Sequence, residues 1–339
     1  MDPDMNNEPR AGLRCLSIVV PCHNEGAGLD AFFARLEAAL AALPQYDYEV
    51  VCVDDGSRDD TLAVLCRHAA RNPRIAVLEL SRNFGKEAAL TCGIDAARGD
   101  AVVPMDADLQ HPPELLPELV RHWVAGSDVV LARRMSRQTD HALYRRGAGL
   151  FYALHNRMSD VALPRDVGDF RLMDRMVVDA LKRLPERRRF MKGLFAWVGF
   201  RQVTVEFPVA ERSAGASSFN VRRLWALALE GITSFSTVPL SVFAYCGFAV
   251  ALLALLGGCW MVVKTLLFGV DVPGYASLLT AVLFLGGVQL MGIGVLGEYI
   301  GRIYSEAKQR PVYLVRRRYG LQDSAGGSAS GEGDDGFAL

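Results

Sequence analysis

The sequence lacks paired cysteine motifs, an excess of charge of either sign, and an apolar leader at its N-terminus. Its seven cysteines are odd in number and show no Cys-x-x-Cys spacing, which argues against a disulfide framework or a zinc site and favours a reducing compartment. The formal net charge is −1 and no basic run is interleaved with aromatics, so we expect no nucleic-acid partner. The polar residues 1–14 predict a flexible start without a signal peptide, which keeps the following domain in the cytoplasm.

In the first half of the chain, short apolar runs alternate with segments whose apolar residues have helical spacing. The predicted strands are 16–20, 48–53, 75–80, 101–105 and 128–132. The predicted helices are 31–42, 60–70, 86–97 and 113–125. This alternation is typical of an α/β domain with a parallel sheet covered by helices. Because such sheets bind ligands at the carboxyl ends of their strands, polar residues at those ends are candidate site residues.

Two acidic clusters, residues 53–59 and 105–113, follow two of these strands. Each cluster taken alone also fits a turn or a helix N-cap. Together they favour a site, because Asp106 and Asp108 alternate along an extended segment and can share one Mg²⁺ or Mn²⁺, with Gln110 adding an amide oxygen. Such an ion stabilises the charge that grows on a departing nucleoside diphosphate. Asp54 and Asp55 are expected to accept hydrogen bonds from the base or ribose.

Long uncharged runs occur only near the C-terminus. The run 238–268 contains Lys264 as its only charge, and the run 276–297 contains none. Each exceeds the roughly 20 residues that cross a bilayer, so we expect two transmembrane helices, with buried core helices as the alternative. Arg222 and Arg223 precede the first run and six basic residues follow the second, whereas the intervening loop carries only Asp271. The positive-inside rule therefore places both flanks, both termini and the N-terminal domain in the cytoplasm.

These features divide the chain into six parts. They are a flexible N-terminus (1–14), a catalytic domain (15–220), a juxtamembrane segment (221–237), a transmembrane hairpin (238–300, with spans 238–268 and 276–299), a cytoplasmic juxtamembrane segment (301–322) and a disordered tail (323–339). The region 133–220 is basic and irregular in pattern. A solvated surface explains such arginines, and so does a ligand that bears phosphate.

Several motifs resemble the family 2 glycosyltransferases of the GT-A fold. They are Val20-Pro21-Cys22-His23-Asn24-Glu25, Asp54-Asp55-Gly56-Ser57, Asn83-Phe84-Gly85-Lys86, Asp106-Ala107-Asp108-Leu109-Gln110, Gly168-Asp169-Phe170-Arg171-Leu172, Arg189-Phe190-Met191-Lys192-Gly193 and Gly297-Glu298-Tyr299-Ile300-Gly301-Arg302. The most similar subgroup is that of the polyprenyl-phosphate glycosyltransferases, which include bactoprenol glucosyltransferases and dolichyl-phosphate mannose synthases. The resemblance spans roughly residues 16–315. It implies a Rossmann-like catalytic domain, amphipathic juxtamembrane helices, two transmembrane helices and a homo-oligomer in a bacterial inner membrane.

The resemblance also implies a reaction. A monosaccharide would be transferred from a nucleotide sugar to the phosphate of a polyprenyl phosphate such as undecaprenyl phosphate, with inversion at the anomeric carbon. The resemblance to the subgroup favours a UDP-sugar as the donor. The residues expected to bind the nucleotide sugar are Pro21, His23, Glu25, Asp54, Asp55, Asp106, Ala107, Arg212 and Ser217. His23 stands where many relatives have tyrosine, and Ser218 replaces a lysine that often ends the segment 212–218.

The acceptor half of the expected reaction involves an acid and three arginines. Asp169 matches the base proposed for the bactoprenol subgroup, although it also fits a positioning or capping role. Two anionic reactants must approach one another, so Arg134, Arg145 and Arg189 are candidates to hold the acceptor phosphate. Asp169, Asp108 and Arg134 are thus the candidate catalytic residues.

Two alternatives stay open at this point. The same fold can act on another acceptor, as a processive or glycolipid synthase, but the chain has neither the Gln-x-x-Arg-Trp segment nor the several spans usual in processive enzymes. The second alternative is a non-catalytic membrane scaffold that keeps a degenerate transferase domain. The intact acidic residues argue against it.

Overall fold

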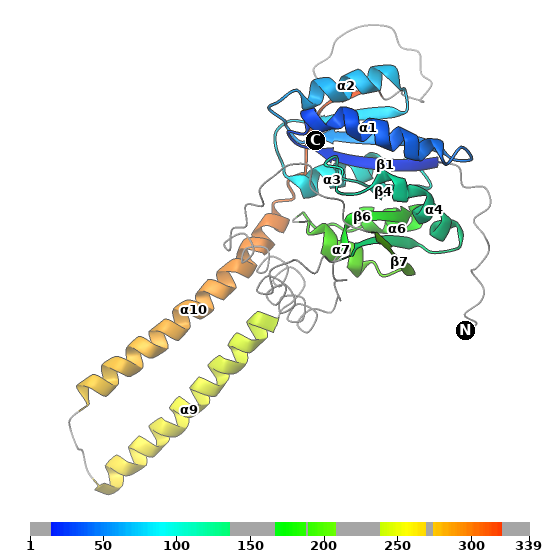
Figure 1. The fold of residues 1–339 in the computed structure, drawn as a ribbon. Helices are drawn as coiled ribbons and strands as arrows, with labels where there is room; N and C mark the ends of the chain where they lie inside the picture. Colours follow the sequence, from blue (N-terminus) through cyan, green and yellow to red (C-terminus); the bar gives the residue numbers. More distant parts are fainter. Residues whose placement is uncertain (1–14, 136–166, 188, 208–237, 269–273, 321–339) are drawn as a thin grey trace. The chain divides into compact units, whose positions relative to one another are not determined.

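A computed structural model describes residues 15–135, 167–187, 189–207, 238–268 and 274–320 (Figure 1). They form two compact units. The first unit holds the described residues 15–114 and 314–320, and the second holds those between 115 and 313. The predicted flexible start, juxtamembrane helices and tail lie outside the described residues.

The first unit is built on five strands in the order β4-β1-β2-β3-β8. Their bounds are β1 Cys15–Cys22, β2 Asp47–Asp54, β3 Ile75–Leu80, β4 Ala101–Pro104 and β8 Val315–Tyr319. β1 to β4 are parallel, and β8 pairs antiparallel with β3. All residues of β3 and β4 are buried, as expected for strands covered on both faces. The predicted parallel α/β sheet is confirmed.

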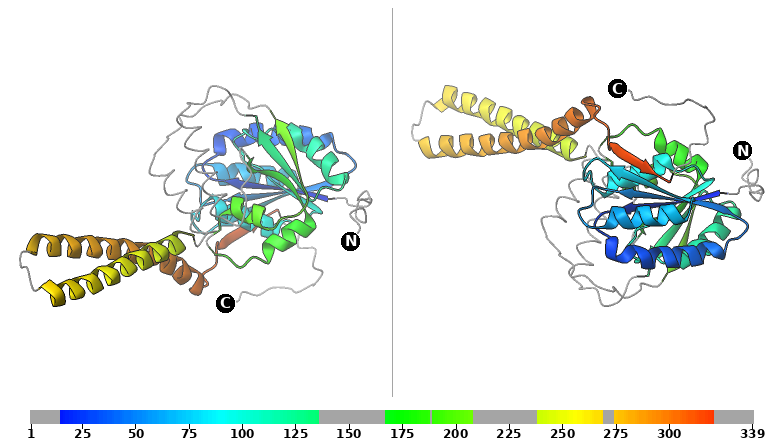
Figure 2. Two further views of the ribbon diagram at one scale, coloured as in Figure 1. Left: turned by 90° about the horizontal axis from the view of Figure 1, so that it is seen from below. Right: turned by 90° about the horizontal axis from the view of Figure 1, so that it is seen from above.

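Three helices cover this sheet: α1 Gly26–Ala41, α2 Thr61–Arg71 and α3 Lys86–Ala96. α1 packs beside α2 (Figure 2), and α3 packs on β1 and β2. The strand order reverses after β3, so right-handed crossovers place α3 on the face opposite α1 and α2. α3 approaches the sheet closely at Gly93, where a Cβ would lie 2.3 Å from Cγ1 of Val19.

β8 is a strand that the sequence analysis did not anticipate. Three successive arginines, Arg316 to Arg318, hide its alternating pattern. Just before it, the Leu314 carbonyl accepts from the Ser81 N–H at 2.9 Å. The carboxylate of Glu79, 7% exposed, accepts from Arg316 Nη1 at 3.1 Å and from the Tyr319 hydroxyl at 2.9 Å. Part of the expected juxtamembrane segment is therefore an edge strand of the first unit.

Tyr319→Phe is expected to lower the stability of this unit, because it leaves one oxygen of a buried carboxylate without its donor. The expected loss is about 1–2 kcal/mol in the free energy of unfolding, read as a lower Tm of the solubilised chain. Arg318→Ala is the matched control, since that side chain is exposed in the same strand. Equal Tm shifts in the two variants would contradict the pairing.

The second unit contains three neighbouring strands in the order β7-β5-β6. β5 (Val129–Arg134) is parallel to β7 (Gln202–Phe207) and antiparallel to β6 (Val167–Asp174). β6 and β7 fall in the basic region that showed no clear pattern. Three helices pack here: α4 Leu116–Val124, which follows the 3-10 turn Pro113–Leu115, α6 Arg175–Lys182 and α7 Met191–Trp197.

Asp174 joins two of these elements. Its carboxylate accepts from the indole N–H of the fully buried Trp123 at 2.8 Å and from the N–H of Met176 at 2.9 Å, which caps α6. A cap of this kind satisfies one of the free N–H groups at a helix start. The acid thus holds α4 and α6 on β6.

Two long helices follow in the same unit, α9 (Val238–Phe268) and α10 (Tyr275–Ala307). They pack closely at Gly292, where a Cβ would lie 2.4 Å from Phe243 Cε1. Within the described residues, the stretch Phe284–Ala307 is long and apolar enough to cross a membrane. α9 matches its predicted bounds, whereas α10 continues beyond residue 299 to Ala307. There the Glu306 carboxylate accepts from the backbone N–H of Arg187 at 3.0 Å. Two transmembrane helices stay a prediction.

Candidate functional site

The first unit contains a cavity of about 340 Å³. It lies at the carboxyl ends of β1, β2 and β4, and β1 and β4 flank the point where the strand order reverses. Open α/β sheets bind their ligands at such a switch point. The lining residues are Pro21, Cys22, His23, Glu25, Asp55, Asn83, Gly85, Lys86, Ala89, Asp106, Ala107 and Asp108. Of the nucleotide-sugar residues predicted in this unit, all except Asp54 line the cavity.

His23 is held by groups from three loops. Its Nδ1 lies 3.0 Å from the Asp55 carbonyl oxygen, and its Nε2 lies 3.1 Å from the side-chain nitrogens of Asn83 and Asn24. Asn24 takes the left-handed conformation, with φ 57°, and its Oδ1 accepts from the Arg58 N–H at 2.9 Å. The loops after β1, β2 and β3 thereby fix one another, and they place the His23 ring at the cavity wall.

The two neighbouring acids Asp54 and Asp55 have different surroundings. Asp54 is 2% exposed and lies outside the cavity lining, and burial raises the pKa of its carboxyl. Asp55 lines the cavity, and its two oxygens accept from the N–H groups of Phe84 at 2.7 Å and Gly85 at 2.9 Å. Gly85 has φ 98°, a conformation that favours glycine. Asp55 thus fixes the turn from which α3 begins, a role that its position in the sequence did not reveal.

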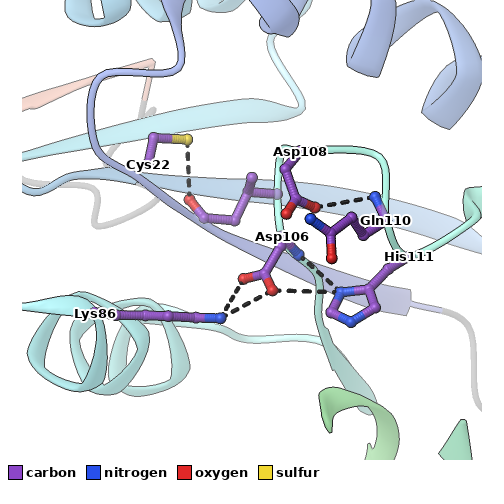
Figure 3. A network of polar contacts seen from close by, with 7 residues as sticks. Cys22, Lys86, Asp106, Asp108, Gln110 and His111 are labelled. Carbon is purple, nitrogen blue, oxygen red and sulfur yellow. Dashed lines mark hydrogen bonds and ion pairs between the residues drawn. The ribbon is translucent and has the colours of Figure 1, made fainter. Parts of the chain in front are cut away.

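The second acidic cluster forms the loop after β4 (Figure 3). The Asp106 carboxylate pairs with the Lys86 ammonium at 2.7 and 2.8 Å, and one of its oxygens lies 3.5 Å from His111 Nδ1. Asp108 Oδ1 accepts from the Gln110 N–H at 3.0 Å. Asp106 and Asp108 both line the cavity, and Gln110 does not. Among the residues that the structure describes, no three His, Cys, Asp or Glu side chains are grouped to hold one ion.

Most of the charged residues that line the cavity are acids. The pKa of the Glu25 carboxyl is raised, first by burial and then by the negative charges of Asp108 and Asp106. Lys86 is the only lysine or arginine among the described residues that line the cavity. An acidic pocket of this size fits a ligand that arrives with a cation.

The acceptor-side candidates belong to the second unit. Asp169 lies in β6, two residues before the buried Arg171. Burial lowers the pKa of Arg171 to about 10, and the charge of Asp169 opposes that shift. The Arg171 guanidinium stacks over Phe195 at 4.1 Å and donates to the Gly168 carbonyl at 2.7 Å. Arg171 therefore links β6 to α7, a role the sequence did not reveal.

The candidate phosphate-binding arginines are described only in part. Arg189 Nη2 donates to the Leu184 carbonyl at 3.0 Å. Arg134 ends β5, and its side chain is outside the described part of the structure. Arg145, Arg212, Ser217 and Ser218 also lie outside the described residues.

Comparison with known proteins assigns the chain to a family. Residues 17–182 match the family described as glycosyl transferase family 2, and residues 238–303 match the GtrB C-terminal hairpin. The chain is 51% identical over 304 residues to the SfII prophage-derived bactoprenol glucosyl transferase of Shigella flexneri, covering 90% of this chain and 98% of the relative. It is 49% identical over 302 residues to the prophage bactoprenol glucosyl transferase homolog of Escherichia coli K12, and the match covers 89% of this chain and 98% of that relative.

Among solved structures, a mannosyltransferase from Pyrobaculum calidifontis in complex with GDP-Man and Mn²⁺ is similar, with 18% identity and a TM-score of 0.46 over 90% of this chain and 89% of that one. Sequence identity near one half over nine tenths of the chain is what decides the family. The chain belongs to glycosyl transferase family 2, in the polyprenyl-phosphate subgroup that carries a GtrB-type C-terminal hairpin, and it is a glycosyltransferase.

Proposed function

We propose that this enzyme transfers one monosaccharide, with inversion, from a UDP-sugar to the phosphate of a polyprenyl phosphate such as undecaprenyl phosphate. The observation that carries the proposal is the acidic cavity at the strand switch point, in a chain half identical to proteins named bactoprenol glucosyl transferases. The reaction would take place at the cytoplasmic membrane face, in a homo-oligomer.

A divalent cation, Mg²⁺ or Mn²⁺, fits the donor side of this cavity. Asp106 and Asp108 offer carboxylate oxygens from one loop, and their charges add to the effect of burial in raising the pKa of Glu25. These two acids would hold the ion, with Gln110 nearby in sequence. The ion supplies stabilisation of the negative charge on the leaving diphosphate. Pro21, His23 and Ala107 would form the wall against the nucleoside.

On the acceptor side, the enzyme needs little base catalysis. A lipid phosphate has a second pKa of about 6 and is therefore largely dianionic near neutral pH. Asp169 would position the acceptor rather than deprotonate it. The three arginines Arg134, Arg145 and Arg189 would hold the acceptor phosphate by charge-assisted hydrogen bonds.

The pairing of β8 supports a hairpin that crosses the membrane twice. β8 follows α10 in the sequence, yet it belongs to the sheet of the first unit. The chain before α9 and the chain after α10 must then lie on the same side of the membrane. An even number of crossings satisfies that requirement, and the basic flanks place this side in the cytoplasm.

The test is to incubate the purified full-length enzyme and Mg²⁺ with undecaprenyl phosphate and, one at a time, radiolabelled nucleotide sugars. We expect label from one UDP-sugar in a lipid product that mild acid cleaves. Diacylglycerol in place of undecaprenyl phosphate is the acceptor control. Label in diacylglycerol would point instead to a glycolipid synthase, and no transfer from any donor would favour the scaffold alternative.

A further inference from the structure

Lys86 is the one charged lining residue to which the sequence analysis gave no role. It is the first residue of α3, and its ammonium contacts both oxygens of Asp106, at 2.7 and 2.8 Å (Figure 3). The side chains are 48% and 24% exposed, so the pair faces the open cavity rather than the core. Lys86 therefore pairs with a carboxylate that would bind the divalent cation in the proposed donor site.

The position of Lys86 is built by the fold. Asp55 holds the N–H groups of Phe84 and Gly85, the two residues before it. The loop after β2 packs closely against this turn, because a Cβ on Gly56 would lie 2.6 Å from the Asn83 backbone nitrogen. Met105, just before Asp106, is held by its N–H bond to the Val19 carbonyl at 2.9 Å. The backbone next to both partners is thus held by hydrogen bonds, and the lysine stem is the part with rotatable bonds.

Competition for Asp106 follows from charge and valence. A carboxylate that accepts from an ammonium on both oxygens cannot present the same lone pairs to a divalent ion without weakening the first contact. A lysine is a compact point charge on a flexible stem, so it can move by a few rotations to another anion. A bound donor would add a diphosphate to this cavity, and Lys86 is the one lysine or arginine among the described lining residues that could pair with it.

We infer that Lys86 is a counter-ion that exchanges partners during the cycle: it neutralises Asp106 in the empty site and moves to the donor diphosphate when a divalent cation takes Asp106. Lys86 then contacts the leaving group and helps to stabilise its charge. The exchange also makes the empty site a poor binder of metal alone and links metal binding to nucleotide binding. This inference rests on the donor half of the proposed function and is independent of the acceptor.

The test compares Lys86→Met with the wild type, as detergent-solubilised full-length chains, and uses Mn²⁺ and UDP as probes. Without nucleotide, Mn²⁺ affinity measured by electron paramagnetic resonance of the free ion is expected to rise about tenfold in Lys86→Met, because the competitor is removed. With saturating Mn²⁺, the UDP affinity measured by calorimetry is expected to fall about tenfold. The opposite signs of the two changes distinguish exchange from a loss of structure.

Lys182→Met, at the last residue of α6, is the matched control and should leave both affinities unchanged. Lys86→Arg keeps the charge and should retain most of the UDP affinity. An unchanged or weaker Mn²⁺ affinity in Lys86→Met would overturn the inference, and so would an unchanged UDP affinity. Because both readouts are binding constants, they stay informative if undecaprenyl phosphate proves not to be the acceptor, which the lipid product assay decides separately.

Discussion

Asp108→Asn is expected to lower kcat by about 100- to 1,000-fold with Mg²⁺ present, with little change in Tm. The amide removes one negative charge from the proposed cation site, and stabilising the charge on a leaving group typically contributes that much to the rate. The loop itself should survive, since an asparagine Oδ1 can still accept from the Gln110 N–H as Asp108 Oδ1 does at 3.0 Å. Initial rates at saturating donor and lipid measure the effect.

The control for this variant is Asp95→Asn, an exposed acid in α3 at the end of the helix opposite Lys86. It should keep the wild-type rate. A near-normal rate of Asp108→Asn in Mg²⁺ would remove Asp108 from the cation site. Raising the Mn²⁺ concentration should recover part of the lost activity if the defect lies in metal affinity.

Replacing residues 238–300 with a flexible Gly-Ser linker is expected to reduce the rate with undecaprenyl phosphate in vesicles by about 100-fold or more. Holding enzyme and lipid in one bilayer raises their effective concentration by factors of this order. The rate with a short, water-soluble polyprenyl phosphate should change little, and so should UDP affinity. Comparable rates of the two chains on the vesicle substrate would show that the hairpin does not contribute to the use of the lipid acceptor.

This design depends on β8. Deleting everything from Val238 onward would also remove β8, and Glu79 would lose both Arg316 and Tyr319. The edge of β3 would be exposed as well, and an open edge promotes aggregation. A linker that retains residues 301–339 keeps these contacts and separates the contribution of the hairpin from the stability of the first unit.

Local patterns predicted the elements with strong signals. The buried parallel strands β1 to β4 read directly as short apolar runs, and β3 has the predicted bounds. β6 was missed because a glycine, an acid and an arginine interrupt its apolar pattern, and the charged Arg171 is buried against Phe195. β7 has a regular alternation of apolar and polar residues, which was overlooked within a basic region. β8 was missed because its stability comes from pairing with a strand more than 200 residues earlier.

Residue types and their order by themselves determined the α/β class, the acidic residues at the strand ends, and the uncharged runs near the C-terminus, because each depends on neighbours in the chain. Only the tertiary structure determined the burial and the hydrogen-bond partners of each acid. It buries Asp54, commits both oxygens of Asp55 to the turn before α3, and brings Lys86 onto Asp106. It also pairs β8 with β3. The reason is physical: contacts between loops after separate strands depend on strand order and register, which no local pattern contains.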